Sequence, residues 1–196
     1  MIKATLIDHM GDDLTPAAAA WVSTGKSRED KTEADAIALI ERLGREGHDS
    51  CFEHLVATFS IEAPIYIMRH IQRHRLGSFN ELSGRYKSLG DATCYVPELA
   101  MEDAQQAILA HFEASLDLYK RLRTMGEPKE VARVVLPLNT MTRIRWTGNL
   151  RYFANFIRLR KTEEAQYEVR LVAGQVLEAL RELWPHSVKA IMRGKV

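Results

Sequence analysis

A regular spacing of apolar residues between Leu55 and Ile61 is the feature that most constrains the fold of this chain. Every second residue there (Leu, Ala, Phe, Ile) is apolar, which is the period of a half-buried β-strand. Pro64 follows, and proline suits the first turn of a helix. We therefore predict a strand that leads into a helix carrying Ile65, Ile67, Met68 and Ile71.

The rest of the chain is mostly helical in pattern. A short strand is expected at Ile2–Leu6, Lys26–Lys31 reads as a charged loop, and Thr142–Thr147 is ambiguous. Apolar residues at helical spacing, bounded by capping residues, glycines or prolines, predict further helices. These fall near 15–23, 32–43 (with a Thr32/Asp35 capping box, and stopped by Gly44 and Gly47), 103–123, 128–137, 149–160 and 163–184.

The chain contains no internal repeat, low-complexity tract or linker. At 196 residues, one domain is the expected organisation. We predict a single domain over residues 1–196, of the α+β class and mostly helical, with a small mixed or antiparallel sheet.

Composition excludes several classes of protein. A net charge of +1 argues against a generally basic nucleic-acid binder. No apolar run is long enough to span a membrane, and the first residues lack the apolar core of a signal peptide. Cys51 and Cys94 have neither metal-type nor disulfide-type spacing. We expect a protein of the reducing cytoplasm, with no membrane or nucleic-acid partner.

The segment Arg69–Tyr86 (RHIQRHRLGSFNELSGRY) concentrates polar chemistry. Arginine offers phosphates a rigid bidentate fork, and glycines allow backbone N–H groups to approach a ligand closely. The segment therefore reads as a site for a phosphorylated ligand. The alternative is a solvated helix end, where positive side chains favour the C-terminal dipole.

A second arginine cluster lies far along the chain. It consists of Arg143, Arg145, Arg151, Arg158 and Arg160. Two such clusters in a nearly neutral protein suggest convergence on a polyanionic ligand. Alternatively they pair with Asp and Glu at the surface, where each ion pair stabilises little.

Three other candidates have ordinary structural explanations. Glu81 could orient a ligand, act as a base or neutralise the neighbouring arginines. His48, with Asp49, Glu53 and His54 close behind, does not form the HExxH spacing of a zinc site, so we expect no metal. Cys51 reads as a small buried thiol.

The sequence from Arg73 to Ser83 has the pattern RHR-x7-S, and RHRLGSFNELSGRY resembles the flavin-dependent thymidylate synthase family. Further blocks resemble that family in the same order and together cover roughly residues 10–185. They are Gly47–His54, the strand before Pro64, Glu130–Asn139, the Asn149/Arg151/Asn155 spacing and Arg158–Arg170.

This resemblance implies a reaction and a fold. The family methylates dUMP to dTMP, with methylenetetrahydrofolate as carbon donor, FAD as redox carrier and NADPH as reductant. It uses no enzyme cysteine as nucleophile. The implied fold is the family's mixed α/β one, assembled as a homotetramer with active sites between subunits, which would let the two arginine clusters meet.

The resemblance also assigns residues to roles. The implied flavin contacts are Ser50, Glu53, Arg73, His74, Arg75, Asn80, Glu81, Asn149, Arg151 and Asn155. The implied dUMP contacts are His70, Arg73, Glu81, Ser83, Gly84, Arg85, Arg133 and Arg160. Arg160 would polarise the uracil ring, and we assign catalytic roles to Arg160, Ser83 and His48.

Three positions depart from the family pattern. His70 and Gln72 stand where the family has a glutamine and an aromatic residue, and Glu164 stands where a histidine often precedes Ala165-Gln166. There are two competing hypotheses, of which only the second depends on His70 and Glu164. One is a binding module that uses the arginines without catalysis, and the other is a diverged member that oxidises its flavin without methyl transfer.

Overall fold

A four-stranded antiparallel sheet forms the centre of the computed structural model, which describes residues 1–98 and 100–193. The strand order is β1-β2-β4-β3, with β1 at Lys3–Met10, β2 at Val56–Pro64, β3 at Ser78–Glu81 and β4 at Met141–Asn149. The predicted α+β class is confirmed, and the sheet is antiparallel throughout. The ambiguous segment 142–147 is the middle of β4.

Strands β2 and β4 pair along their whole length, from Val56 opposite Asn149 to Pro64 opposite Met141. Alternate residues of both strands are buried on one face, including Phe59, Ile61 and Trp146. Strand β3 was not predicted, because its four residues lie inside the polar motif and show no alternation.

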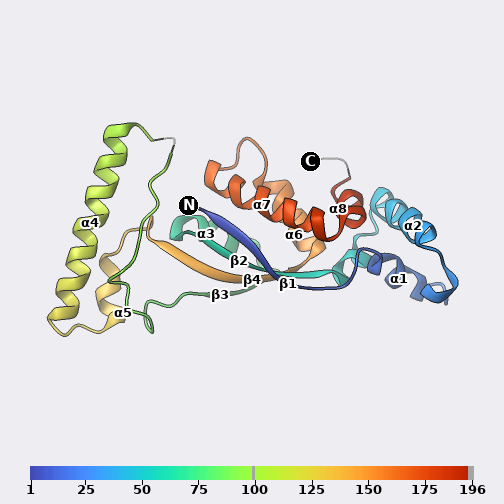
Figure 1. The fold of residues 1–196 in the computed structure, drawn as a ribbon, viewed down its shortest axis with the longest axis horizontal. Helices are drawn as coiled ribbons and strands as arrows, with labels where there is room; N and C mark the ends of the chain where they lie inside the picture. The colour runs from blue at the N-terminus through green and yellow to red at the C-terminus, as the bar shows by residue number, and fades with distance from the viewer. Residues whose placement is uncertain (99, 194–196) are drawn as a thin grey trace.

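Helices cover one face of the sheet (Figure 1). They are α3 at Ile65–Gln72, α6 at Leu150–Arg160, α7 at Tyr167–Leu183 and α8 at Pro185–Met192. Pro64 ends β2 with extended backbone and immediately precedes α3, close to the predicted position. The predicted helix at 163–184 begins later, at Tyr167. Pro185, which the sequence pattern predicts as a helix stop, instead occupies the first turn of α8, a position that proline also suits.

At the end of the sheet where the chain enters β2, α1 (Thr15–Val22) and α2 (Glu33–Glu46) pack beside a 3₁₀ helix, η2 (Asp49–His54). A shorter 3₁₀ helix, η1 (Arg28–Asp30), lies in the charged loop. The Thr32/Asp35 capping box is confirmed. Gly44, expected to stop α2, lies inside it, and Gly47 with φ +79° ends the helix.

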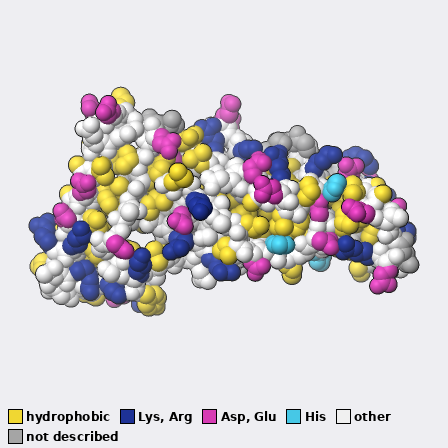
Figure 2. Space-filling view, viewed as in Figure 1, with side chains coloured by type: hydrophobic (Ala, Val, Ile, Leu, Met, Phe, Trp, Pro, Cys, Tyr) yellow, Lys and Arg dark blue, Asp and Glu magenta, His cyan; other side chains and the backbone are white. Residues whose placement is uncertain are grey.

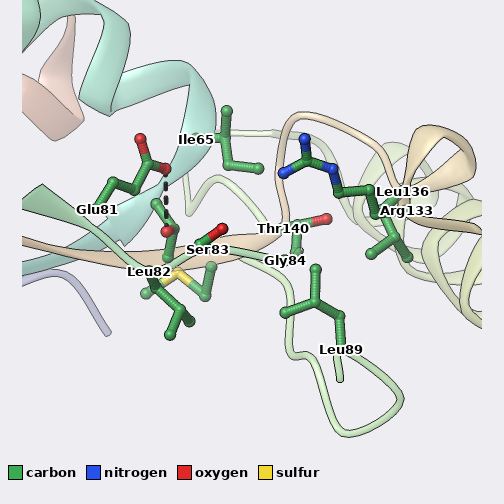
Figure 3. Close-up of a pocket in the computed structure, with 11 residues that line it drawn as sticks. Ile65, Glu81, Leu82, Ser83, Gly84, Leu89, Arg133, Leu136 and Thr140 are labelled. Carbon is green, nitrogen blue, oxygen red and sulfur yellow. Dashed lines mark hydrogen bonds between the residues drawn. The ribbon is translucent and has the colours of Figure 1, made fainter. Parts of the chain in front are cut away.

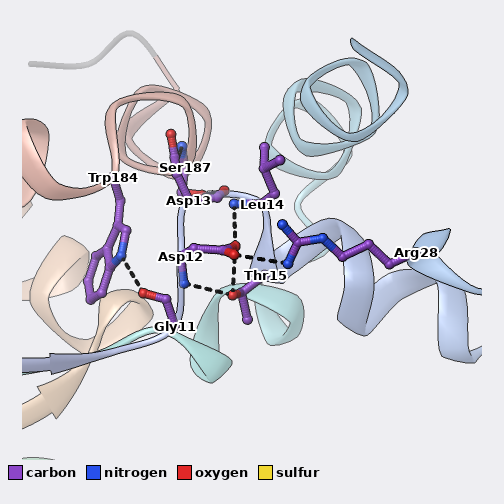
Figure 4. Close-up of polar contacts among 8 residues, drawn as sticks. All are labelled: Gly11, Asp12, Asp13, Leu14, Thr15, Arg28, Trp184 and Ser187. Carbon is purple, nitrogen blue, oxygen red and sulfur yellow. Dashed lines mark hydrogen bonds and ion pairs between the residues drawn. The ribbon is translucent and has the colours of Figure 1, made fainter. Parts of the chain in front are cut away.

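The N-terminal segment is tied to the C-terminal helix (Figure 4). The Asp13 carboxylate accepts hydrogen bonds from the backbone N–H groups of His186 (2.7 Å) and Ser187 (2.8 Å), which begin α8. The indole N–H of Trp184 donates to the carbonyl of Gly11 at 3.0 Å. The two bonds to Asp13 satisfy backbone donors that a helix N-terminus otherwise leaves unpaired.

At the opposite end lie α4 (Glu102–Thr124), α5 (Lys129–Ala132) and the 3₁₀ helix η3 (Arg133–Val135) (Figure 1). Helix α4 buries only Phe112 and Tyr119 and exposes Leu109 and Leu118. Figure 2 shows hydrophobic side chains gathered on the visible face over this region. Within the described residues, none of the helices has the length and hydropathy needed to span a membrane.

Candidate functional site

A cavity of about 320 Å³ brings together four of the predicted nucleotide residues, Glu81, Ser83, Gly84 and Arg133 (Figure 3). It lies between the end of β3, the start of α3 and the α5–η3 segment. We call it the Ser83 pocket. Its remaining walls are Ile65, Leu82, Leu89, Leu136, Thr140, Met141 and Thr142.

A tight turn after β3 positions Ser83. The backbone N–H of Leu82 continues the ladder by donating to the Arg143 carbonyl at 2.9 Å. The Ser83 carbonyl then accepts from the N–H groups of Tyr86 (3.1 Å) and Lys87 (3.0 Å). This turn aims the Ser83 side chain at the pocket, as Figure 3 shows.

Gly84 is required by its neighbours. A Cβ at this position would lie 2.8 Å from Leu89 Cδ1 and 3.1 Å from Arg133 Cδ. Glycine therefore lets Leu89 and the stem of Arg133 approach the turn closely. Arg85 is exposed, and its Nε donates to Glu130 Oε2 at 3.0 Å. That exposed ion pair joins the turn to α5.

Glu81 is held from two sides. Thr142 Oγ1 donates to Oε1 at 3.1 Å, and Gln72 Nε2 donates to Oε2 at 3.4 Å. Thr142 is buried on β4. The pocket thus presents a fixed carboxylate and the guanidinium of Arg133, which can respectively accept hydrogen bonds from a base or sugar and bind a phosphate.

His74 and Arg160 form the second group. Arg160 Nε donates a hydrogen bond to His74 Nε2 at 3.1 Å. The His74 side chain is buried, and this burial, followed by the Arg160 charge, lowers its pKa from 6.5 to about 4. The imidazole is therefore neutral near pH 7. Arg160 of the second arginine cluster therefore contacts the Arg69–Tyr86 segment within one chain, whereas Arg151 of the same cluster pairs with Glu53 elsewhere.

His70, one helical turn before His74, lies in the same electrostatic environment. Burial and then the Arg160 charge lower its pKa, while the Glu168 carboxylate opposes them. Glu168 itself is buried on α7.

Arg73, Arg75 and Asn80 are exposed beside this group. Neither Arg73 nor Arg75 forms an ion pair within the part of the chain that the structure describes. Asn80 pairs in register with Arg145 across β3 and β4. Unpaired guanidiniums at the surface suit a pyrophosphate.

The remaining predicted flavin and catalytic residues lie at the other end of β2. Arg151 Nη1 and Glu53 Oε1 form an ion pair of 2.5 Å, and this hydrogen bond to Glu53 raises the pKa of Arg151. His48 is exposed, with Nε2 3.3 Å from Glu46 Oε2. His48 and Ser50 line a cavity of about 390 Å³ beside α1 and α2. Asn155 is exposed on α6.

Asn149 has a structural task in this region. Its side chain caps α6 by accepting a hydrogen bond from the Tyr152 N–H at 2.9 Å. Oδ1 is therefore occupied, which leaves the side-chain NH₂ for a ligand.

The structure does not bring all the predicted residues together. The Ser83 pocket lies at the Pro64 end of β2, whereas His48 and Ser50 lie just before its Val56 end. These ends are roughly 26 Å apart at about 3.3 Å per residue. Ser83 and His48 of one chain therefore do not share a single small-molecule site.

Two residues that contact the site were not anticipated. Thr142 holds Glu81, and Tyr152 donates from its hydroxyl to the His74 carbonyl at 2.7 Å. Alternation along 141–149 would have placed Thr142 on the buried face of a strand, as a polar residue among apolar ones. The contact of Tyr152, by contrast, depends on the tertiary fold.

Comparison with known proteins places this geometry in context. A family model described as "Thymidylate synthase complementing protein" matches residues 5–186. The flavin-dependent thymidylate synthases of Thermotoga neapolitana and Pseudothermotoga lettingae are 40% and 39% identical over 199 residues, covering 96% of this chain and 89% of each relative.

A solved structure is similar over nearly the whole chain. The UMP/dUMP methylase PolB from Streptomyces cacaoi, bound with 5-Br dUMP, superposes with a TM-score of 0.87 at 31% identity. The match covers 98% of this chain and 95% of that one.

Proposed function

Because this chain belongs to the flavin-dependent thymidylate synthase family, we propose that it reductively methylates dUMP to dTMP. The observation that carries the proposal is the Ser83 pocket. It gathers Glu81, Ser83, Gly84 and Arg133, residues that the family resemblance assigns to dUMP. Similarity to a methylase whose structure contains 5-Br dUMP supports the same substrate class.

The proposed co-substrates are methylenetetrahydrofolate as carbon donor and NADPH as reductant, with FAD as the redox cofactor. The donor set fits a flavin dinucleotide. Arg73 and Arg75 are exposed without ion-pair partners among the described residues, and Asn80 and Asn155 add exposed amides. When bound, FAD supplies the hydride chemistry that protein side chains lack.

We assign phosphate binding to Arg133 and Ser83, which line the Ser83 pocket, and to Arg85, which follows Ser83 by two residues in the same turn. Arg85 can exchange its exposed Glu130 partner for the phosphate, since exposed ion pairs of this kind stabilise little. Glu81 accepts hydrogen bonds, and Thr142 and Gln72 keep its carboxylate in place. Gly84 leaves room for Arg133 to reach the nucleotide.

Arg160 is the proposed catalytic arginine. A guanidinium at the pyrimidine edge stabilises the negative charge that develops as C5 becomes nucleophilic. The Nε of Arg160 is hydrogen-bonded to the neutral imidazole of His74, which does not offset its charge. The full positive charge of Arg160 therefore remains available to the pyrimidine ring. His70 and Arg73 complete the proposed contacts with the nucleotide.

We propose that the enzyme is a homotetramer with shared active sites. Two observations support this assembly. The Ser83 pocket and the His48/Ser50 region lie at opposite ends of β2, so a site using both needs two chains. Helix α4 exposes Leu109 and Leu118, apolar residues that a neighbouring subunit can cover. In this arrangement, the flavin held by one subunit would contact the residues near the Val56 end of β2 in another subunit. These residues are His48, Ser50, Glu53, Asn149, Arg151 and Asn155.

We place the enzyme in the cytoplasm, where both free cysteines remain reduced. Apart from its own subunits, we expect only small-molecule partners.

The proposal is tested by incubating purified protein with dUMP, FAD, NADPH and methylenetetrahydrofolate and measuring dTMP. Omission of each component and replacement of dUMP by UMP are the controls. Formation of dTMP that requires all four components supports the proposal. A flavin-loaded protein that forms no dTMP contradicts it.

A further inference from the structure

A buried chain of hydrogen bonds connects the centre of the sheet to Arg160. The indole N–H of Trp146 donates to the Tyr152 hydroxyl at 2.9 Å, and this hydroxyl donates to the His74 carbonyl at 2.7 Å. The side chain of His74 is also bonded: its Nε2 accepts a hydrogen bond from Arg160 Nε at 3.1 Å. His74 is therefore held by both its backbone and its ring.

Two glycines fix the tyrosine in this chain. A Cβ on Gly148 would lie 2.3 Å from Tyr152 Cδ1, and one on Gly77 would lie 2.7 Å from the Tyr152 hydroxyl. Gly77 belongs to the polar motif and Gly148 to β4. The close fit around Tyr152 leaves its hydroxyl little freedom to move away from His74.

The His74 ring is confined on its faces and edges. It packs edge-to-face against Phe156 at 5.1 Å and Tyr152 at 6.4 Å between ring centroids. It is 8% exposed. A ring so enclosed presents its Nε2 lone pair in one direction, toward Arg160, and its neutral form carries the remaining proton on Nδ1.

We propose that His74 is a positioning residue, which sets the orientation of the Arg160 guanidinium through the bond from Nε to Nε2. This role rests on the proposed function, because it concerns the arginine assigned to the pyrimidine. An arginine side chain has many rotamers, and fixing Nε within the guanidinium plane also fixes the directions of the two Nη groups. A preoriented fork avoids the reorganisation that a mobile one would need during reaction.

A matched pair of variants separates this role from packing. His74→Phe keeps an aromatic ring against Phe156 and removes the acceptor. His74→Gln removes the ring and keeps an acceptor, Oε1, near the position of Nε2. Positioning predicts a loss of kcat on the order of 100-fold in His74→Phe and a much smaller loss in His74→Gln. Equal losses, or a larger loss in His74→Gln, would overturn the proposal.

Each variant is also combined with Arg160→Ala. If His74 acts through Arg160, His74→Phe lowers kcat no further once Arg160 is absent. A full, additive loss in the double variant would show that His74 acts independently, which overturns the proposal.

Crystal structures of the wild type and both variants, grown with FAD, test the geometry without turnover. The proposal predicts one Arg160 rotamer in the wild type and in His74→Gln, and displacement or disorder of that side chain in His74→Phe. An unchanged Arg160 in His74→Phe, or a wild-type Nε–Nε2 separation beyond hydrogen-bond distance, overturns it. Because this readout needs no dTMP, it distinguishes failure of the positioning role from failure of the proposed reaction.

Discussion

Thr142 Oγ1 donates a hydrogen bond of 3.1 Å to Glu81 Oε1, joining the buried face of β4 to the rim of the Ser83 pocket. The only other side chain bonded to this carboxylate among the described residues is Gln72, at 3.4 Å. The direction of the Glu81 carboxylate therefore depends mainly on one buried hydroxyl.

Thr142→Val removes that hydroxyl while keeping the side-chain shape. We expect the KM for dUMP to rise roughly fivefold, equivalent to about 1 kcal/mol, with little change in flavin binding. Thr142→Ser is the matched control, because it keeps the hydroxyl. Equal effects of the two substitutions would show that the hydrogen bond does not matter for dUMP.

Ser83→Ala tests the nucleotide turn itself. Loss of one hydroxyl that faces the pocket should raise the KM for dUMP by about fivefold to tenfold and leave the fold intact. Ser78→Ala, an exposed serine at the start of β3 and outside the pocket, is the control. Full activity of Ser83→Ala at limiting dUMP would remove Ser83 from the nucleotide site.

Arg160→Ala should reduce kcat on the order of 100-fold or more, since it removes charge that stabilises the developing negative charge on the ring. Flavin content, measured by absorbance after gel filtration, should change much less. Loss of flavin with normal dUMP handling would instead assign Arg160 to the cofactor site.

His74 makes the stability of the fold depend on pH. Its pKa falls from 6.5 to about 4 through burial and the Arg160 charge, so the unfolded chain binds a proton there that the folded chain does not. This contribution to stability is present in full above pH 6.5 and is lost as the pH falls toward about 4. In His74→Gln, the free energy of unfolding should therefore decrease less on acidification than in the wild type, by on the order of 2 kcal/mol.

Urea unfolding of both proteins at about pH 7 and about pH 4.5, at one protein concentration, measures this difference. Parallel loss of stability in the wild type and His74→Gln would show that other groups account for the acid sensitivity.

Substitution by alanine should have opposite effects on the stability of the fold at two helical glycines, Gly44 and Gly174. A Cβ on Gly44 would lie 2.3 Å from the carbonyl oxygen of Ala190, and rigid backbone cannot yield, so Gly44→Ala should destabilise the fold by about 1–3 kcal/mol. A Cβ on Gly174 meets no described atom within 4 Å, so Gly174→Ala in α7 should stabilise by about 1 kcal/mol. Thermal unfolding measures both, and a stabilising Gly44→Ala would contradict the packing of α2 against α8.

Much of the fold could be predicted from local patterns. The strand after Leu55 and the capping box at Thr32 follow from periodicity and side-chain chemistry, and both are confirmed. Strand β3 could not be predicted, because its polar residues serve the site and its pairing with β4 is a long-range contact. Gly44 is a similar case, since its role depends on Ala190, far away in the sequence.

The candidate site divides in the same way. The family resemblance assigned Ser83, Gly84 and Arg133 to one ligand, and the structure places all three around one pocket. The sequence did not predict that the His74 ring would be buried and hydrogen-bonded to Arg160. That contact requires Tyr152, Gly77 and Gly148, whose roles depend on tertiary packing.

The most direct test of the proposed nucleotide and flavin sites is the absorption spectrum of the FAD-loaded protein, recorded before and after addition of dUMP. We predict that dUMP shifts the flavin band in the wild type and does so only at higher dUMP concentration in Ser83→Ala, because both ligands share one site. A protein that binds no FAD, or a flavin band that dUMP leaves unchanged at saturating concentration, would contradict this account.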